Sequence, residues 1–309
     1  MTPDLTVELC GIRLRNPLIL ASGVLGTEPA ILHRVGLAGA GAVTSKSCSL
    51  QPRAGHPNPT VLDWGPGLIN AVGLANPGVE EEIRILRQAR ERLAGQDVAL
   101  FASIVADTVE GFAEVARRVS EAQPDLIEVN ISCPNVISEF GELFATRPEP
   151  AAEVTRAVKE ATDIPISVKL SPNVTDIVTI ARAVAEAGAD AITAINAVGP
   201  GMVIDVESGR PVLSNREGGI SGPAIRPIAV RCVYQIARAV DVPVIGTGGV
   251  TRGRDVVEML MAGATAVGVG SVVYWRGPEV FDELRAELTE FLVAHGYRSL
   301  DDIRGVAHR

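Results

Sequence analysis

Eight short apolar runs alternate with amphipathic stretches along the whole chain, and this alternation limits the possible folds more than any other feature. Each run is nearly continuous and consists mostly of Val, Ile, Leu, Ala or Thr, which is typical of strands buried on both faces of a parallel sheet. The expected strands are residues 17–23, 41–47, 98–104, 126–132, 164–171, 190–198, 242–250 and 265–271.

The stretches between and after these runs have the spacing of amphipathic helices, as Ile83, Leu86 and Leu93 show within 79–94. Eight strands in strict alternation with eight helices predict an α/β fold, a (β/α)8 TIM barrel, with a doubly wound open sheet as the alternative. The expected helices are residues 28–38, 79–94, 107–122, 149–161, 174–187, 223–240, 252–262 and 278–295.

Three helix-to-strand junctions share the tripeptide Ala-Gly-Ala, within AGAGAV, EAGADAI and MAGATAV. A glycine at this place predicts a helix that ends in the left-handed region of backbone conformation. The repetition of one junction supports a repeated strand–helix unit.

Three segments fall outside the repeat. Residues 5–15 predict an N-terminal hairpin that caps the bottom of the barrel, and residues 48–78 and 199–222 are insertions after the second and sixth strands. Both insertions leave the carboxyl ends of strands, where barrel active sites are built. Since barrels of this size form one unit, we expect a single domain over 1–309.

Composition narrows the class of protein. The 37 acidic residues outnumber the 28 basic ones, giving a net charge of −9, which argues against a nucleic-acid partner. The start of the chain lacks the pattern of a signal peptide, and no apolar run approaches the roughly 18 residues that span a bilayer. We therefore expect a cytoplasmic protein without a membrane contact.

No metal site is expected, because the cysteines form no CxxC pair and lie far apart, at Cys10, Cys48, Cys133 and Cys232.

Polar residues gather where the expected strands end. Lysine is rarely buried without a partner or ligand, so two lysines at these apolar strand ends predict a bound anion. The residues in question are Ser22, Lys46, Ser47, Ser103, Asn130, Asn135, Lys169, Asn196, Gly248, Gly249, Gly270 and Ser271.

Three of the side chains allow more than one interpretation. Lys46 could reach solvent or contact an anion or flavin, and Lys169 could reach water at the rim, form a Schiff base or supply a fixed positive charge. Cys133 lies in NISCPN, just past the fourth strand, beside a proline that stiffens the loop. A thiol there favours a general base over a nucleophile, because no histidine stands in a recognisable Cys–His motif.

Glycine pairs end the seventh and eighth strands, in IGTGGV and VGVGS. Loops at these two strands of a barrel often bind phosphate through backbone N–H groups. A ligand that carries phosphate is therefore predicted.

Together the motifs NISCPN, NAVGLANPG, SVKLSPN, INAVGPGMVID, GGISGP and GTGGV resemble the class 1 dihydroorotate dehydrogenases over nearly the whole chain. Within that class NAVGLANPG, GMVID and the ending GVAHR are most similar to class 1B. The membrane-bound class 2 enzymes differ in having an extra N-terminal helical region and a serine base.

The resemblance implies a barrel that binds one FMN and oxidises dihydroorotate to orotate in pyrimidine biosynthesis. Cys133 would take a proton from carbon 5, and Lys169 would face the flavin and offset the charge of its reduced form. The implied substrate contacts are Lys46, Asn70, Ala71, Val72, Gly73, Leu74, Asn130, Asn135, Asn196 and Ala197. The implied FMN contacts are Ser22, Lys46, Ser47, Ser103, Asn130, Lys169, Ile195, Gly222, Gly248, Gly249, Gly270 and Ser271, of which the last four would take the phosphate.

Two positions depart from the family pattern. Ser103 stands where Asn is common, and Ala197 stands where Ser or Thr is common, so one hydroxyl contact to substrate is missing.

Class 1B further implies a partner subunit that carries FAD and a [2Fe–2S] cluster and passes electrons to NAD, in a heterotetramer built on a catalytic homodimer. The alternatives are a class 1A enzyme that reduces fumarate, a Schiff-base lyase that uses Lys169, and a barrel that only binds nucleotides.

Overall fold

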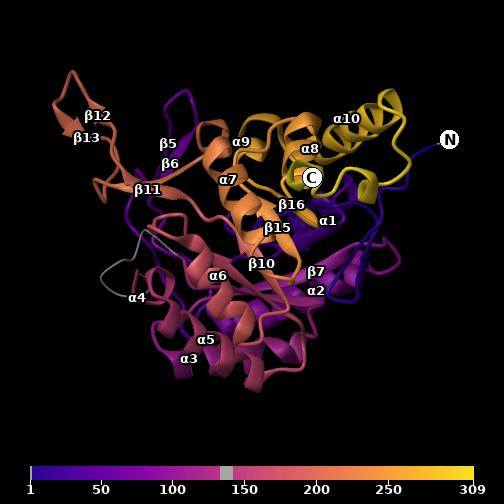
Figure 1. The fold of residues 1–309 in the computed structure, drawn as a ribbon. Helices are drawn as coiled ribbons and strands as arrows, with labels where there is room; N and C mark the ends of the chain where they lie inside the picture. The colour runs from indigo at the N-terminus through magenta and orange to yellow at the C-terminus, as the bar shows by residue number, and fades with distance from the viewer. Residues whose placement is uncertain (1, 133–141) are drawn as a thin grey trace.

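A computed structural model describes residues 2–132 and 142–309. Its centre is a closed barrel of parallel strands, in which the last strand pairs with the first (Figure 1). Closure excludes the open doubly wound sheet, and the predicted TIM barrel is confirmed. Each strand lies within one of the expected runs: β3 (Leu18–Leu20), β4 (Ala42–Thr44), β7 (Ala99–Ile104), β8 (Leu126–Asn130), β9 (Ile166–Leu170), β10 (Ala191–Ala194), β15 (Val244–Thr247) and β16 (Ala266–Val269).

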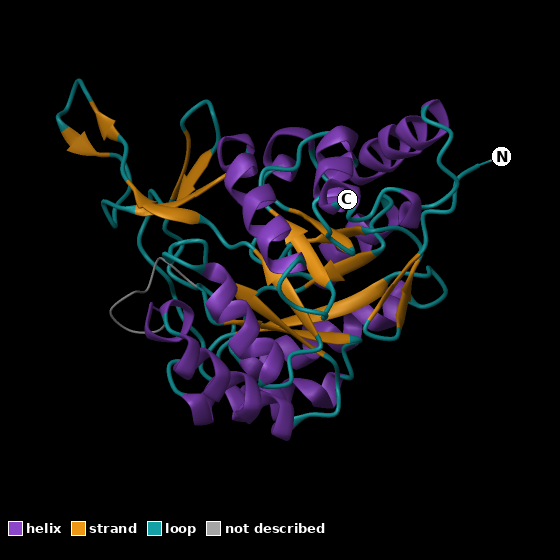
Figure 2. Cartoon of the chain, viewed as in Figure 1, coloured by secondary structure: helices purple, strands orange, loops and turns teal. Residues whose placement is uncertain are grey.

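Helices cover the outside of the barrel (Figure 2). None of those within the described ranges is long and apolar enough to cross a membrane. The helices that follow the barrel strands are α1 (Pro29–Leu37), α2 (Val79–Leu93), α3 (Val109–Val119), α5 (Pro148–Ala161), α6 (Ile177–Glu186), α7 (Arg226–Ala237), α8 (Gly253–Met261) and α10 (Val280–Ala294). Shorter helical turns are η1 (Ser120–Ala122), α4 (Glu142–Thr146), η3 (Pro223–Ile225), α9 (Val272–Arg276), η4 (Leu300–Asp302) and η5 (Val306–His308).

The glycines of the three Ala-Gly-Ala junctions have the predicted conformation. Gly39, Gly188 and Gly263 have φ angles of 106°, 102° and 106°. A side chain in this region of φ is strained, so glycine allows each helix to end sharply and the chain to turn into the next strand.

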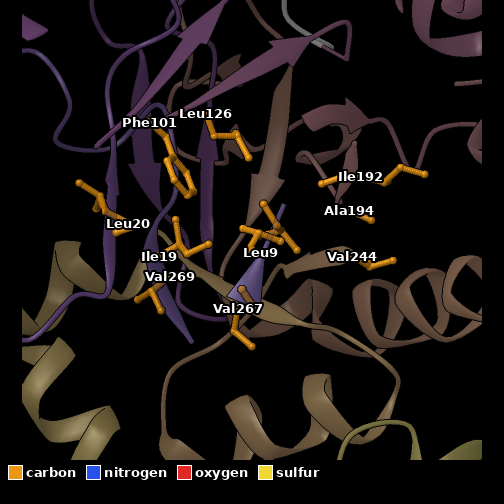
Figure 3. Close-up of a cluster of buried hydrophobic side chains, with 14 of the residues drawn as sticks. Leu9, Ile19, Leu20, Phe101, Leu126, Ile192, Ala194, Val244, Val267 and Val269 are labelled. Carbon is orange, nitrogen blue, oxygen red and sulfur yellow. The ribbon is translucent and has the colours of Figure 1, made fainter. Parts of the chain in front are cut away.

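The N-terminal segment forms a hairpin against the barrel. Strands β1 (Val7–Leu9) and β2 (Ile12–Leu14) pair antiparallel. Next to them the Cys10 thiol donates to the carbonyl of Asp190, 3.3 Å away, immediately before β10 begins. Figure 3 shows Leu9 among buried side chains of the barrel strands. The hairpin therefore lies at the amino-terminal ends of the strands, away from the end where the insertions leave.

The two insertions join in one antiparallel sheet, which the sequence did not predict. Asn70 of the first insertion pairs with Gly219 of the second. The sheet stands beside the carboxyl end of the barrel (Figure 1) and forms one side of the site. Its strands, in spatial order, are β11 (Val198–Gly201), β14 (Gly218–Ser221), β6 (Leu68–Asn70) and β5 (Val61–Asp63), and a separate two-stranded ribbon contains β12 (Ile204–Asp205) and β13 (Arg210–Pro211).

Candidate active site

A cavity of about 320 Å³ opens at the carboxyl ends of the barrel strands. Its size is in the usual range for a small-molecule site. The predicted site residues that line it are Ser22, Asn70, Val72, Lys169, Ile195, Asn196, Ala197, Gly222, Gly248, Gly249, Gly270 and Ser271.

The other predicted site residues fall in two groups. Cys133 and Asn135 lie outside the described residues. The rest are described by the structure but do not line this cavity: Lys46, Ser47, Ala71, Gly73, Leu74, Ser103 and Asn130.

A buried ion pair stands on the barrel wall. Nζ of Lys169 lies 3.5 Å from Oε1 of Glu128, and both side chains are less than 10% exposed. The Ser22 hydroxyl bridges them: it accepts from Lys169 at 2.9 Å and donates to Glu128 at 2.5 Å. A lysine that forms a Schiff base needs a free amine, whereas the nitrogen of Lys169 is engaged by a carboxylate and a hydroxyl. The contacts thus favour a fixed positive charge at Lys169.

Glu128 is a site residue that the sequence analysis missed. Its signal was present, because side chains two residues apart on a strand share a face, so Glu128 must point to the same side of β8 as Asn130. In the β8–β9 register Asn130 stands opposite Lys169. A charged residue inside an otherwise apolar strand next to Lys169 was therefore its natural partner.

Buried hydroxyls continue from this carboxylate along the wall. The Ser103 hydroxyl donates to Oε1 of Glu128 at 3.1 Å, and its oxygen lies 2.8 Å from that of Ser47. The Asn130 amide in turn donates to the Ser47 hydroxyl at 3.1 Å. Ser103 thus contacts both the carboxylate and Ser47.

The same line of contacts reaches the cavity on the far side of Asn130. The Ser132 hydroxyl donates to the side-chain oxygen of Asn130, and the Asn196 amide donates to the Ser132 hydroxyl, each at 3.0 Å. The side-chain oxygen of Asn196 accepts from the backbone N–H of Ala197 at 2.8 Å. Both asparagines are therefore fixed in orientation before any ligand binds.

The loop after β6, whose Val72 lines the cavity, has a strained backbone. Gly73 and Leu74 have φ angles of 72° and 56°, a conformation that is costly for leucine. The Asn76 amide donates to the Leu74 carbonyl at 2.8 Å and holds this turn. At the start of the loop, Asn70 donates to the Gly219 carbonyl at 3.4 Å, which ties the two insertions together.

A second strand-end lysine, Lys46, follows β4. Its backbone N–H donates to the Gly26 carbonyl at 2.9 Å. Near it, Glu82 of α2 is fully buried, and neither of its carboxyl oxygens has a well-formed hydrogen bond among the described residues. Burial raises the pKa of Glu82 to about 7, although the Ser45 hydroxyl and the Lys46 charge oppose the rise.

Glycines form the opposite end of the cavity, at β15 and β16. A side chain at Gly249 would place its Cβ 2.5 Å from Cβ of Arg226, and the φ angle of Gly249 is 77°. The hydroxyl oxygen of Thr247, which also lines the cavity, is buried without a hydrogen-bond partner in the part of the chain that the structure describes. Gly270 and Ser271 lead directly into α9. Glycine-rich backbone at the ends of two neighbouring strands is typical of a site that binds an anion through N–H groups.

The family model described as dihydroorotate dehydrogenase matches residues 4–292. The chain belongs to the dihydroorotate dehydrogenase family. It is 48% identical over 307 residues to the dihydroorotate dehydrogenase B (NAD(+)), catalytic subunit, of Methanothermobacter thermautotrophicus, with 98% of each chain covered.

Two further relatives carry the same name. The protein from Methanocaldococcus jannaschii is 44% identical over 304 residues, with 98% of each chain covered. That from Pyrococcus abyssi is 44% identical over 303 residues, with 98% of this chain and 99% of the relative covered. Within the dihydroorotate dehydrogenase family, these matches place the chain with the class 1B catalytic subunits, as the motifs predicted.

Membership in the dihydroorotate dehydrogenase family implies FMN, and the cavity suits it. Lys169 and Ser22 offer donors at one end. At the other end, the backbone packs so tightly that a side chain at Gly248 or Gly249 would collide with α7, and the cavity also holds the buried hydroxyl of Thr247, which has no hydrogen-bond partner among the described residues. The donor set thus matches a ligand with a polar ring edge and a phosphate.

Proposed function

We propose that this chain oxidises dihydroorotate to orotate in pyrimidine biosynthesis. The observation that carries the proposal is the cavity itself. It combines a buried cation, an oriented asparagine at the end of β10 and a glycine-lined end, in a chain of the dihydroorotate dehydrogenase family. When bound, FMN supplies the acceptor for the hydride that leaves carbon 6 of the substrate.

The phosphate of FMN would rest on the glycine end. Backbone N–H groups of Gly248, Gly249, Gly270 and Ser271 are the proposed donors. We propose that each chain binds one FMN. Ser22, Ser47, Ser103, Ile195 and Gly222 would complete its surroundings. Lys169 would face the ring edge that becomes negative on reduction, where a preorganised charge stabilises the product of hydride transfer.

Substrate would lie between FMN and the loop after β6. Asn70, Asn130, Asn135 and Asn196 are the proposed partners of its amide edges, and Lys46 of its carboxylate. Ala71, Val72, Gly73, Leu74 and Ala197 would form the wall. Since Ala197 has no hydroxyl, the proposed contact there is to backbone alone.

Cys133 is the proposed base. It follows Ser132 directly in the sequence, and a thiolate can accept the proton that leaves carbon 5. Lys169 then has an electrostatic role and no covalent one. A lyase that used Lys169 in a Schiff base would be colourless and would be trapped with substrate by borohydride.

The test of this base is Cys133→Ser. We expect the variant to keep FMN, but dihydroorotate should reduce that FMN about 100-fold more slowly at pH 7, since a positioned base contributes roughly that much or more. The loss should shrink as pH rises, because a serine hydroxyl is much less acidic than a thiol.

Cys10→Ser is the matched control. Burial raises the pKa of the Cys10 thiol to about 11, and this thiol is at the opposite end of the barrel. Its replacement should leave flavin reduction unchanged. Equal rates for Cys133→Ser and wild type at pH 7 would remove Cys133 from the mechanism.

Electrons would leave through a second subunit. The relatives' name contains both NAD(+) and "catalytic subunit". We propose a partner that carries FAD and a [2Fe–2S] cluster, with two catalytic chains and two partners in the complex. The chain alone should then reduce dyes or oxygen but not NAD, and should gain NAD reduction when a class 1B electron-transfer subunit is added. Steady turnover with fumarate, without NAD activity in the mixture, would instead assign it to class 1A.

A further inference from the structure

The buried ion pair contains one residue, Glu128, that the proposed reaction does not use. One oxygen of its carboxylate, Oε1, receives three donors: the Ser22 hydroxyl at 2.5 Å, the Ser103 hydroxyl at 3.1 Å and the Lys169 ammonium at 3.5 Å. Convergence of donors on a single oxygen is typical of an ionised carboxylate. A negative charge therefore stands beside the cation that would face FMN.

Stability alone does not account for this pair. Removing two charges from water costs about as much as their attraction returns, so apolar residues at such sites are often as stable. Lys169 and its bridging partner Ser22 both line the cavity wall, so one end of the pair meets a ligand while Glu128 lies behind it.

The hydroxyl contacts fix the carboxylate from behind. Ser103 does not line the cavity and is itself in contact with Ser47, which accepts from Asn130. Glu128 is thus held by the barrel wall and not by the ligand. Its position is therefore set by contacts within the protein.

We propose that Glu128 is a positioning residue that holds Lys169 and offsets part of its positive charge, and so sets the balance between the binding of oxidised and reduced FMN. This inference rests on the proposed function. Reduced flavin carries an extra negative charge at the ring edge, so a stronger net positive field favours it over oxidised flavin. Without Glu128 the field of Lys169 is uncompensated, and reduced FMN should gain affinity relative to oxidised FMN.

The test is the midpoint potential of FMN bound to the full chain, compared with that of free FMN, which gives the ratio of the dissociation constants for oxidised and reduced FMN. In Glu128→Gln we expect this ratio to rise about tenfold, which for a two-electron couple is a shift of about 30 mV to higher potential. Lys169→Met should lower the ratio, and the double variant should return to within about threefold of wild type.

Glu128→Asp separates charge from shape. It keeps the negative charge but shortens the side chain, so its ratio should stay within about threefold of wild type, whereas a merely structural role predicts as much disturbance as in Glu128→Gln. The matched control is Glu114→Gln, which removes a carboxylate from an exposed ion pair with Arg117 and should change the ratio less than twofold.

A ratio that is unchanged or lowered in Glu128→Gln would overturn the inference, and so would equal shifts in the Asp and Gln variants. If Glu128→Gln does not fold, Glu128→Asp and the double variant still decide. Failure of the proposed function is seen in the wild-type chain. If that chain does not bind FMN, or if dihydroorotate does not reduce its FMN, both the proposed function and this inference are overturned.

Discussion

Among the residues that the structure describes, two glutamates are buried, Glu128 in the barrel wall and Glu82 on a covering helix, and the protein surrounds their carboxyl groups differently. Glu128 on β8 accepts from two hydroxyls and pairs with Lys169. Glu82 on α2 is fully buried, and its carboxyl oxygens lack well-formed hydrogen bonds to the described residues. The pKa of Glu82 rises to about 7, mainly because burial disfavours the charged form.

The difference shows that burial alone does not decide the role of a carboxyl group. Where the barrel wall supplies donors, the carboxyl group is paired with a lysine that lines the cavity and can act on a ligand through it. Where a helix face supplies none, the group loses its charge near neutral pH. Replacing Lys169, the partner of Glu128, should therefore impair the reaction, whereas replacing the carboxyl group of Glu82 should stabilise the fold.

The largest effect is expected from breaking the pair inside the wall. Lys169→Ala leaves the Glu128 charge without its partner, and FMN without its cation. We expect dihydroorotate to reduce bound FMN about 10²- to 10³-fold more slowly, a typical loss for one preorganised electrostatic group. Stopped-flow measurement of flavin absorbance checks this.

The control is Lys159→Ala, which breaks a half-exposed ion pair with Asp190 near the other end of the barrel. Its rate of flavin reduction should match wild type. Comparable losses in both variants would mean that the wall pair has no special part in the chemistry.

Glu82→Gln should increase the free energy of unfolding relative to wild type near neutral pH. In wild type, the raised pKa means that the native state holds a proton more tightly than the unfolded chain. Native stability is therefore undiminished below the unfolded pKa of about 4.5 and falls as pH rises toward about 7. The variant cannot lose this proton, so its advantage over wild type in free energy of unfolding should grow by about 2–3 kcal/mol between pH 5 and pH 8.

Urea unfolding at several pH values measures this advantage. Glu81→Gln, next to it on α2 but half-exposed, is the control and should show no such trend. An advantage for Glu82→Gln that is constant over pH would contradict the raised pKa of this carboxyl group.

The smallest effect should come from removing one donor of Glu128. Ser103→Ala deletes a buried hydrogen bond to the carboxylate and the contact with Ser47. We expect a loss of about 1–2 kcal/mol in the free energy of unfolding, as for a buried hydrogen bond to a charged group. A variant as stable as wild type would show that this hydroxyl does not support the charge.

Much of this molecule could be predicted from local sequence. The barrel strands follow from continuous apolar runs, and the sharp helix ends at Gly39, Gly188 and Gly263 follow from their residue type. The lining of the cavity by Lys169, Asn196 and the glycine pairs follows from their place at strand ends, because barrel topology brings such ends together. The roles of Cys133 and Asn135 stay predictions, since these residues lie outside the described chain.

Two kinds of feature were not predicted. One depends on contacts between segments far apart in the sequence, and the other on the spacing of charged residues along a buried face. The sheet that joins β6 to β14 pairs segments far apart in sequence, and no local pattern specifies that register. Glu128 and Glu82 did have signals, since Glu128 shares a strand face with Asn130 and Glu82 shares the buried helix face of Val79 and Leu86. A charged residue whose spacing places it on the buried face of a strand or helix is therefore as informative as a polar residue at a strand end.

The most direct test of the proposed activity is anaerobic addition of dihydroorotate to the purified chain. We predict a yellow protein whose visible flavin absorption is lost on addition, with about one orotate formed per FMN, because each substrate molecule delivers one hydride. A colourless chain that cannot be reconstituted with FMN would contradict the account. So would an FMN-loaded chain whose absorption dihydroorotate leaves unchanged.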